Sequence, residues 1–290
     1  MKYNAKKTIA LILSVVFVLM LFAGCGSSSN GGNESKPANR LEEIKQRGYI
    51  TVTMEPYFAP NEFIDSSKTG DDQYVGSDIE FAKYIAEKLG VELQLVPLEF
   101  GAVLSSIVEG KYDLAISALG YTPERAESME LSKGYYFSDD DLGYGLVIRE
   151  ADKDVITSIE DLKDKVVMAQ SGSLQESLLL QNVKEYGELK VLSSTPDCYM
   201  ALSEGKSDCV CVAVAHVQLY MDANPDCGLY VMENVHFDTP EEFDGARVGA
   251  PKGETELIDF VNECIDELLA SGQYAAWYDE YKEYAAKLGV

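Results

Sequence analysis

An apolar strand that runs into an arginine-bearing turn is the first place in this chain where side chains could do chemistry. Residues 110–125 read Gly-Lys-Tyr-Asp-Leu-Ala-Ile-Ser-Ala-Leu-Gly-Tyr-Thr-Pro-Glu-Arg. A guanidinium is always charged and matches a carboxylate through two parallel hydrogen bonds. Held beside the N–H groups of a glycine-containing turn, Arg125 would bind a carboxylate. The alternative is an ordinary surface arginine in the first turn of a helix.

A second anion site is predicted at Ser171-Gly172-Ser173, where a strand turns through glycine into a helix. Ser173 and Glu176 have the spacing of a capping box. The free N–H groups and the positive dipole end of such a helix favour an anion. Many helices begin this way without a ligand, so this motif indicates an anion-binding site only if it faces Arg125.

Two further segments place aromatic rings and an acid after predicted strands. Glu55-Pro-Tyr-Phe58 follows the first strand, and Phe100 follows the second. Two aromatic walls could enclose a ligand side chain, with Glu55 accepting a hydrogen bond from a ligand donor. The alternative for each ring is a place in the hydrophobic core.

Alternating strands and helices must position these residues. The pattern predicts a strand at 49–53, a helix capped by Asp78 and closed by Gly90, strands at 91–96 and 112–117, and a second series from about residue 159. The fold class is therefore α/β, with two open sheets and helices on both faces. The chain returns to the first series near residue 246, so two hinge strands join two lobes. Ligands bind such sheets at the carboxyl ends of strands.

The amino terminus predicts an export signal. Lys2, Lys6 and Lys7 precede the apolar run 9–22, which ends in Ala-Gly-Cys25. An uncleaved membrane helix is the alternative, but the run is short of the roughly 20 residues that a span needs. The segment resembles the lipobox of bacterial lipoproteins, which implies that Cys25 is diacylated and anchors the protein. Residues 26–40 are polar and glycine-rich, as in a flexible tether.

The net charge and the cysteine content limit which partners and cofactors this protein is expected to bind. The formal net charge is −25, from 24 basic and 49 acidic side chains, which argues against a nucleic-acid partner. Five cysteines remain beyond Cys25, an odd number, and the two histidines make no zinc-like spacing with them. We expect Cys209 and Cys211 to be small buried hydrophobes, and we leave a disulfide between Cys198 and Cys227 open. We expect no metal and no cofactor.

Several motifs together resemble the family 3 solute-binding proteins of ABC amino-acid importers, which have the type II periplasmic-binding-protein fold. The resemblance covers nearly everything from Leu41 to the end. The motifs are Gly76-Ser-Asp-Ile-Glu-Phe-Ala, Glu109-Gly-Lys-Tyr-Asp-Leu, Thr122-Pro-Glu-Arg, Leu131-Ser-Lys-Gly-Tyr-Tyr, Glu160-Asp-Leu-Lys-Asp-Lys, Ser171-Gly-Ser and Ser271-Gly-Gln-Tyr-Ala-Ala-Trp-Tyr.

The resemblance implies a set of ligand-binding residues and no catalytic ones. Arg125 would clamp an α-carboxylate, and the Ala118 carbonyl would accept from the ligand's ammonium. The implied set is Glu55, Phe58, Phe100, Ala118, Gly120, Thr122, Arg125, Gln170, Ser173, Leu174 and Ala213.

Three positions depart from the family pattern. Ala213 stands where an aspartate normally pairs with the ligand's α-ammonium, Gly120 lacks a common hydroxyl, and Glu55 replaces a common aspartate. Burying an ammonium without a partner costs several kcal/mol. Either Glu55 or another nearby acid is the counter-ion, or the ligand has no normal α-amino group.

The resemblance also implies an organisation and a set of partners. Residues 1–24 would be the signal peptide, 25–40 the tether, 41–146 with 247–290 lobe 1, and 147–246 lobe 2. We expect a monomeric receptor on the outer face of the cytoplasmic membrane that delivers its ligand to an ABC permease. The alternatives are a dehydratase of a cyclic carboxylic acid on the same scaffold, with Glu55 as the general acid, and a ligand-sensing module for a receptor partner.

Overall fold

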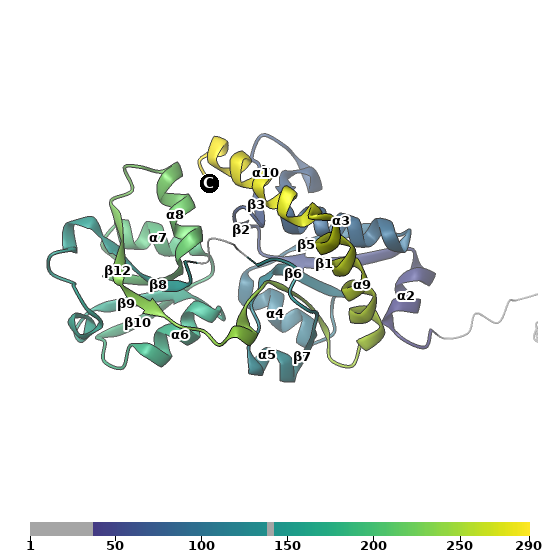
Figure 1. The fold of residues 1–290 in the computed structure, drawn as a ribbon, viewed down its shortest axis with the longest axis horizontal. Helices are drawn as coiled ribbons and strands as arrows, with labels where there is room; N and C mark the ends of the chain where they lie inside the picture. The colour runs from purple at the N-terminus through teal and green to yellow at the C-terminus, as the bar shows by residue number, and fades with distance from the viewer. Residues whose placement is uncertain (1–36, 138–141) are drawn as a thin grey trace, which may run out of the picture. The chain divides into compact units, whose positions relative to one another are not determined.

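The structure, a computed structural model, describes residues 37–137 and 142–290 (Figure 1). The predicted signal peptide, the lipidation site Cys25 and most of the tether lie outside the described residues. Among those that are described, no helix combines the length and the apolar character that crossing a membrane requires.

Two five-stranded sheets confirm the predicted open α/β architecture. In the first sheet β1 is parallel to β5 and β6, and β13 is antiparallel to β6 and β7. Its order is β5 (Glu92–Pro97), β1 (Tyr49–Met54), β6 (Leu114–Leu119), β13 (Arg247–Pro251), β7 (Met129–Leu131). We call the half of the molecule built on this sheet lobe 1.

The second sheet has the same plan. Here β9 is parallel to β10 and β11, and β8 is antiparallel to β11 and β12. Its order is β10 (Glu188–Leu192), β9 (Val166–Gln170), β11 (Cys209–Ala213), β8 (Tyr144–Arg149), β12 (Leu229–Phe237). We call the half built on this sheet lobe 2. The residue boundaries of the two lobes given above stay a prediction.

Helices cover both faces of each sheet because alternate strand residues are apolar on both sides. In lobe 1, α2 (Arg40–Arg47), α3 (Ser77–Leu89) and α9 (Thr255–Ser271) pack on one face and α4 (Phe100–Val108) on the other. In lobe 2, α6 (Leu174–Asn182) covers one face, and α7 (Thr195–Ser203) and α8 (Val214–Ala223) cover the other. Helix α5 (Pro123–Ser128) follows β6, and α10 (Gln273–Leu288) contacts both α3 and α8.

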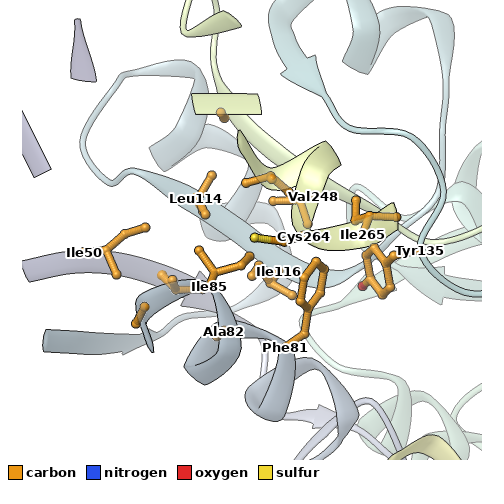
Figure 2. Packing of buried hydrophobic residues seen from close by; sticks show 14 of the residues in the cluster. Ile50, Phe81, Ala82, Ile85, Leu114, Ile116, Tyr135, Val248, Cys264 and Ile265 are labelled. Carbon is orange, nitrogen blue, oxygen red and sulfur yellow. The ribbon is translucent and has the colours of Figure 1, made fainter. Parts of the chain in front are cut away.

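The largest apolar cluster lies between the first sheet and the helices α3 and α9 (Figure 2). Phe81 and Ile85 of α3 meet Ile116 of β6 and Ile265 of α9, all nearly inaccessible to solvent. This core fixes the strands whose carboxyl ends carry the site.

A small third sheet positions the loop after β1. It consists of β2 (Tyr57–Phe58), β3 (Glu62–Ile64) and β4 (Tyr74–Val75). Gly76 allows it to lie against α3, because a Cβ at this residue would stand 2.0 Å from the carbonyl oxygen of Asn61. The backbone of Gly76, with φ +134°, is also one that other residues rarely adopt.

Asp78 does not cap α3 as the sequence predicts. The N-cap is Gly76, and Asp78 lies inside the first turn with a fully buried side chain. Its carboxylate instead accepts hydrogen bonds from the Ala118 N–H at 2.8 Å and from the hydroxyls of Tyr135 and Tyr274. The prediction was wrong because these partners come from β6 and from distant parts of lobe 1, which local spacing does not reveal.

The chain passes between the sheets twice. It leaves lobe 1 between β7 and β8 and returns between β12 and β13. A single bridge between Tyr136 and Ala246 pairs the two passing segments. Phe137 lies against Gly245, where a Cβ would come within 2.6 Å of its ring.

Candidate functional site

A cavity of about 170 Å³ brings together residues of both lobes. Four predicted residues reach it from strand ends, because Glu55 follows β1, Gly120 follows β6, Gln170 ends β9 and Ala213 ends β11. An apolar cavity of about this size is known to hold benzene, so the space suits a ligand of a few heavy atoms up to a small amino acid.

Nearly all of the predicted site residues line this cavity. They are Glu55, Phe58, Phe100, Ala118, Gly120, Arg125, Gln170, Ser173, Leu174 and Ala213. Thr122 is the exception. It is the N-cap of α5, where its hydroxyl accepts a hydrogen bond from the Arg125 N–H at 3.1 Å. Thr122 therefore orients the turn that carries the arginine.

The Arg125 side chain is buried and joins main-chain atoms of both lobes. Nη1 donates to the Gly120 carbonyl at 2.7 Å, and Nη2 donates to the Gly172 carbonyl of lobe 2 at 3.0 Å. The guanidinium also lies 5.5 Å from the Phe100 ring centroid. Burial lowers the pKa of Arg125 to about 10, so the group stays charged at neutral pH. Carbonyl groups do not neutralise this charge, whereas a bound carboxylate would.

The helix turn facing Arg125 is partly occupied by its own acid. Ser173 is the N-cap of α6, and its Oγ accepts from the Glu176 N–H at 3.1 Å. The Glu176 carboxylate, however, accepts from the Gly172 N–H at 2.7 Å. The left-handed conformation of Gly172, with φ +74°, forms the tight turn in which this contact is made. The predicted hydrogen bond between the Ser173 side chain and the Glu176 N–H is confirmed. The Gly172 N–H, which was expected to be free to bind an anion, has the Glu176 carboxylate as its partner.

Ala118 adopts a left-handed backbone that its residue type rarely takes. Its φ is +46°, and among the described residues it is the sole non-glycine residue with positive φ. Such strain costs of the order of 1–3 kcal/mol and persists where surrounding contacts impose it. The hydrogen bond from the Ala118 N–H to the buried Asp78 carboxylate is such a contact. The conformation shapes the cavity wall between Ser117 and Gly120.

Glu55 is buried with an unsatisfied carboxyl oxygen. Its side chain belongs to a residue only 1% exposed, and Oε1 has no hydrogen-bond partner among the described residues. Burial raises the pKa of Glu55 to about 8, a hydrogen bond with the Gln170 side chain opposes this shift, and the charge of Asp197 adds to it. A cation entering the cavity would stabilise the ionised form of Glu55.

Glu62 of β3 lines the same cavity but is not among the residues predicted from the sequence. Its Oε1 accepts from the Ser117 hydroxyl at 2.8 Å, and that hydroxyl in turn accepts from the Glu55 N–H at 3.0 Å. Burial, followed by repulsion from Asp78, raises the pKa of Glu62 well above its ordinary value. Both effects favour the protonated form of Glu62, whose Oε2 has no hydrogen-bond partner among the described residues.

His216 is the second residue that the sequence analysis missed. It lies in the first turn of α8, and its ring stacks on Phe58 of lobe 1 with centroids 3.9 Å apart and planes 20° apart. Nε2 lies 3.2 Å from Oδ1 of Asn61. Phe58 thus lines the cavity as predicted, but one face of its ring packs against a residue of the opposite lobe.

The structure also shows whether the cysteines are paired and whether side chains gather as they would to bind a metal ion. All five cysteines of the described residues are free, so Cys198 and Cys227 form no disulfide, and the interpretation of Cys209 and Cys211 as buried hydrophobes is confirmed. Within residues 37–137 and 142–290, no group of three or more histidine, cysteine, aspartate or glutamate side chains could hold a metal ion.

Comparison with protein families gives a match over most of the chain. Residues 50–284 match the model described as "Bacterial extracellular solute-binding proteins, family 3". Among curated proteins, the chain is 27% identical over 269 residues to the arginine-binding extracellular protein ArtP of Bacillus subtilis, covering 92% of this chain and 94% of that protein. It is also 27% identical over 245 residues to the L-cystine-binding protein TcyJ of Escherichia coli, covering 83% and 85%.

Solved structures show the same fold. An amino acid ABC transporter substrate-binding protein from Streptococcus pneumoniae bound to L-arginine matches with a TM-score of 0.73 and 28% identity, covering 84% of this chain and 98% of that chain. AbpA from the same organism, also bound to L-arginine, matches with a TM-score of 0.72 and 32% identity, covering 83% and 98%. The architecture is accordingly the type II periplasmic-binding-protein fold predicted above, and the chain belongs to the family 3 bacterial extracellular solute-binding proteins.

Proposed function

We propose that this protein binds an amino acid, or a closely related small carboxylate, between its two lobes and delivers it to an ABC permease. The protein would act outside the cytoplasmic membrane, held there through a lipidated Cys25, and would catalyse no reaction. The amino-acid-binding relatives support the ligand class, because the names of ArtP and TcyJ specify amino acids.

The observation that carries the proposal is that a buried cation and a buried acid line one cavity. Arg125 has no carboxylate among its hydrogen-bond partners in the described part of the chain, and Glu55 has an unsatisfied oxygen. An amino acid brings a carboxylate for Arg125 and an ammonium for Glu55. Binding would therefore satisfy both groups at once.

Glu55 would take the role of counter-ion that Ala213 cannot fill. Ala213 lines the cavity without a charge, whereas Glu55 and the neutral Glu62 are the buried acids of lobe 1 there. Closure then depends on a ligand that touches both lobes. The free energy by which the ligand favours closure is the difference between its binding free energies in the closed and open forms.

Calorimetry with the compact unit formed by residues 37–290 tests the proposal. The protein is unfolded and refolded to remove bound ligand, then titrated with the twenty standard L-amino acids and their deaminated counterparts. Binding of at least one amino acid, lost in Arg125→Ala, is the expected result. Binding of deaminated acids alone would replace the amino acid with a simple carboxylate, and no binding in either series would contradict the proposal.

An enzymatic role on the same scaffold remains a second candidate because Glu55 is positioned to act as an acid. A cavity carboxyl with a pKa near 8 is protonated at neutral pH and could donate a proton to a leaving hydroxyl. Incubation with a cyclic carboxylic acid that carries a hydroxyl leaving group would reveal this role as loss of water. Binding without turnover would leave the receptor as the function.

A further inference from the structure

His216 belongs to α8 of lobe 2, and its polar side chain lines the cavity. Its ring contacts Phe58 and Asn61 of lobe 1. The cavity residues at the start of this helix are Ala213, Ala215 and His216, of which only the histidine can form a side-chain hydrogen bond. Phe58 stacks on its ring and Asn61 contacts its Nε2. Its Nδ1 is buried and has no hydrogen-bond partner among the described residues.

A directed chain of hydrogen bonds assigns the proton on His216. At the far end, the Tyr274 hydroxyl donates to the Asp78 carboxylate. The Tyr274 oxygen accepts from Nδ2 of Asn61 at 3.1 Å, so Nδ2 is the donating end of this amide. Oδ1 of Asn61 is then an acceptor and requires an N–H at His216 Nε2, 3.2 Å away. In the neutral ring Nδ1 is consequently a bare acceptor.

Burying a bare acceptor without a donor is unfavourable, because the hydrogen bond that it made to water in the unfolded chain is not replaced. Protonating it would not remove this cost, because a second positive charge would then be buried together with Arg125. Burial indeed lowers the pKa of His216 to about 4, which keeps the ring neutral. A hydrogen-bond donor on a ligand that reaches Nδ1 would satisfy this nitrogen without introducing a buried charge on the ring.

We propose that His216 contacts the ligand directly, with Nδ1 accepting a hydrogen bond from an N–H group of the bound amino acid while Nε2–H fastens lobe 2 to Asn61 of lobe 1. This inference rests on the proposed amino-acid-binding function. It adds a specificity requirement to that function. The ligand must present an N–H donor at the corner of the cavity where Phe58 and Asn61 lie, and an acceptor group there is rejected.

Three substitutions separate the roles of the two ring nitrogens. His216→Gln keeps a donor near the position of Nε2 but places no acceptor at that of Nδ1. His216→Asn does the reverse, and His216→Phe keeps the stacking on Phe58 without either nitrogen. Each purified variant is titrated calorimetrically with the amino acid that wild type binds most tightly among the twenty standard ones. Thermal unfolding without ligand checks that each variant is folded.

We expect His216→Gln to bind this amino acid about tenfold more weakly, and His216→Phe more weakly still. In ¹⁵N-histidine-labelled protein, the Nδ1 resonance of His216 should be that of an unprotonated nitrogen and should shift when the ligand is added. The chain has only one other histidine, His236, and the spectrum of His216→Gln identifies its signals.

Three results would contradict either the inference about His216 or the proposed amino-acid-binding function. If His216→Gln binds as tightly as wild type, or if Nδ1 carries the proton in the ligand complex, His216 is not a ligand acceptor and the inference is wrong. If wild type itself binds none of the twenty amino acids, the proposed function fails, and the inference fails with it.

Discussion

The Asp78 carboxylate holds Ala118 in a left-handed conformation through a 2.8 Å hydrogen bond from the Ala118 N–H. Asp78 lies in α3 and Ala118 in β6, so the contact joins a helix to the strand that ends at the cavity. The same carboxylate accepts from Tyr135 and Tyr274. A buried acid thus maintains the backbone geometry of the site wall without lining the cavity itself.

Replacing Asp78 with asparagine should lower both stability and affinity. The amide keeps one acceptor oxygen and presents an NH₂ group where the carboxylate accepted, so at least one buried donor loses its partner. We expect the free energy of unfolding to fall by about 3 kcal/mol, measured by urea denaturation. Glu87→Gln, on the exposed face of the same helix, is the matched control and should change stability by less than about 0.5 kcal/mol. Equal stability of both variants would show that the Asp78 hydrogen bonds are dispensable.

Arg125→Lys should bind the ligand far more weakly although the positive charge is retained. Lysine cannot donate in two fixed directions to Gly120 and Gly172 and also face a carboxylate. We expect a loss of about 2–5 kcal/mol in binding free energy, measured by calorimetry. Arg149→Lys in lobe 2 removes a guanidinium that pairs with Asp152 and Asp208 and should leave affinity unchanged. Equal affinity of wild type and Arg125→Lys would exclude bidentate binding.

Stability of the ligand-free protein should fall as the pH rises from about 4.5 to about 8, in part because of Glu55. In this window the unfolded chain has lost the Glu55 proton while the folded protein, with its raised pKa, retains it. The folded state binds more protons, so stability falls by up to about 1.4 kcal/mol per pH unit. Glu55→Gln should match wild type near pH 4.5 and be more stable near pH 8.

Glu62 shifts in the same direction, so Glu55→Gln should reduce the pH slope of wild type without abolishing it. Exposed Glu204→Gln is the control for a change of charge alone. Parallel curves of unfolding free energy against pH for wild type and Glu55→Gln would show that Glu55 ionises normally in the folded protein.

The cysteines should react with thiol reagents in a fixed order. Burial raises the pKa of Cys198 to about 12 and that of Cys264 to about 11, and it also raises the pKa values of Cys209 and Cys211. Cys227 is the least buried of the five cysteines that the structure describes. Mass spectrometry of native protein should therefore show modification of Cys227 first, with the others modified only on unfolding. Early modification of Cys211 would show that the lobe 2 core opens readily.

The sequence predicted those parts of the fold that depend on local pattern. The strand predicted at 49–53 corresponds to β1, Tyr49–Met54, because alternation of apolar residues just before a turn is a local signal. The helix start that carries Arg125 was predicted because Thr-Pro-Glu-Arg places a cap and the arginine three positions apart. Both signals are contained within a few neighbouring residues.

Glu62 and His216 escaped prediction because their environment is made by distant parts of the chain. Glu62 sits in a three-residue strand, too short for periodicity, and is buried by contacts with Ser117 and Asp78. His216 lies on a helix whose partners, Phe58 and Asn61, precede it by more than 150 residues. Asp78 was misread for the same reason, since aspartate near a helix start is usually a cap.

The two charged candidate ligand contacts, Glu55 and Arg125, both belong to lobe 1, and this has a consequence for the kinetics of binding. A ligand can dock on lobe 1 while the protein is open, so the association rate should depend on lobe 1 and on diffusion. Lobe 2 contributes Gln170, Ser173 and His216 to the cavity, and under the proposed function these would reach the ligand only after closure. Substitutions in lobe 2 should therefore shorten the residence time of the complex and leave its rate of formation nearly unchanged.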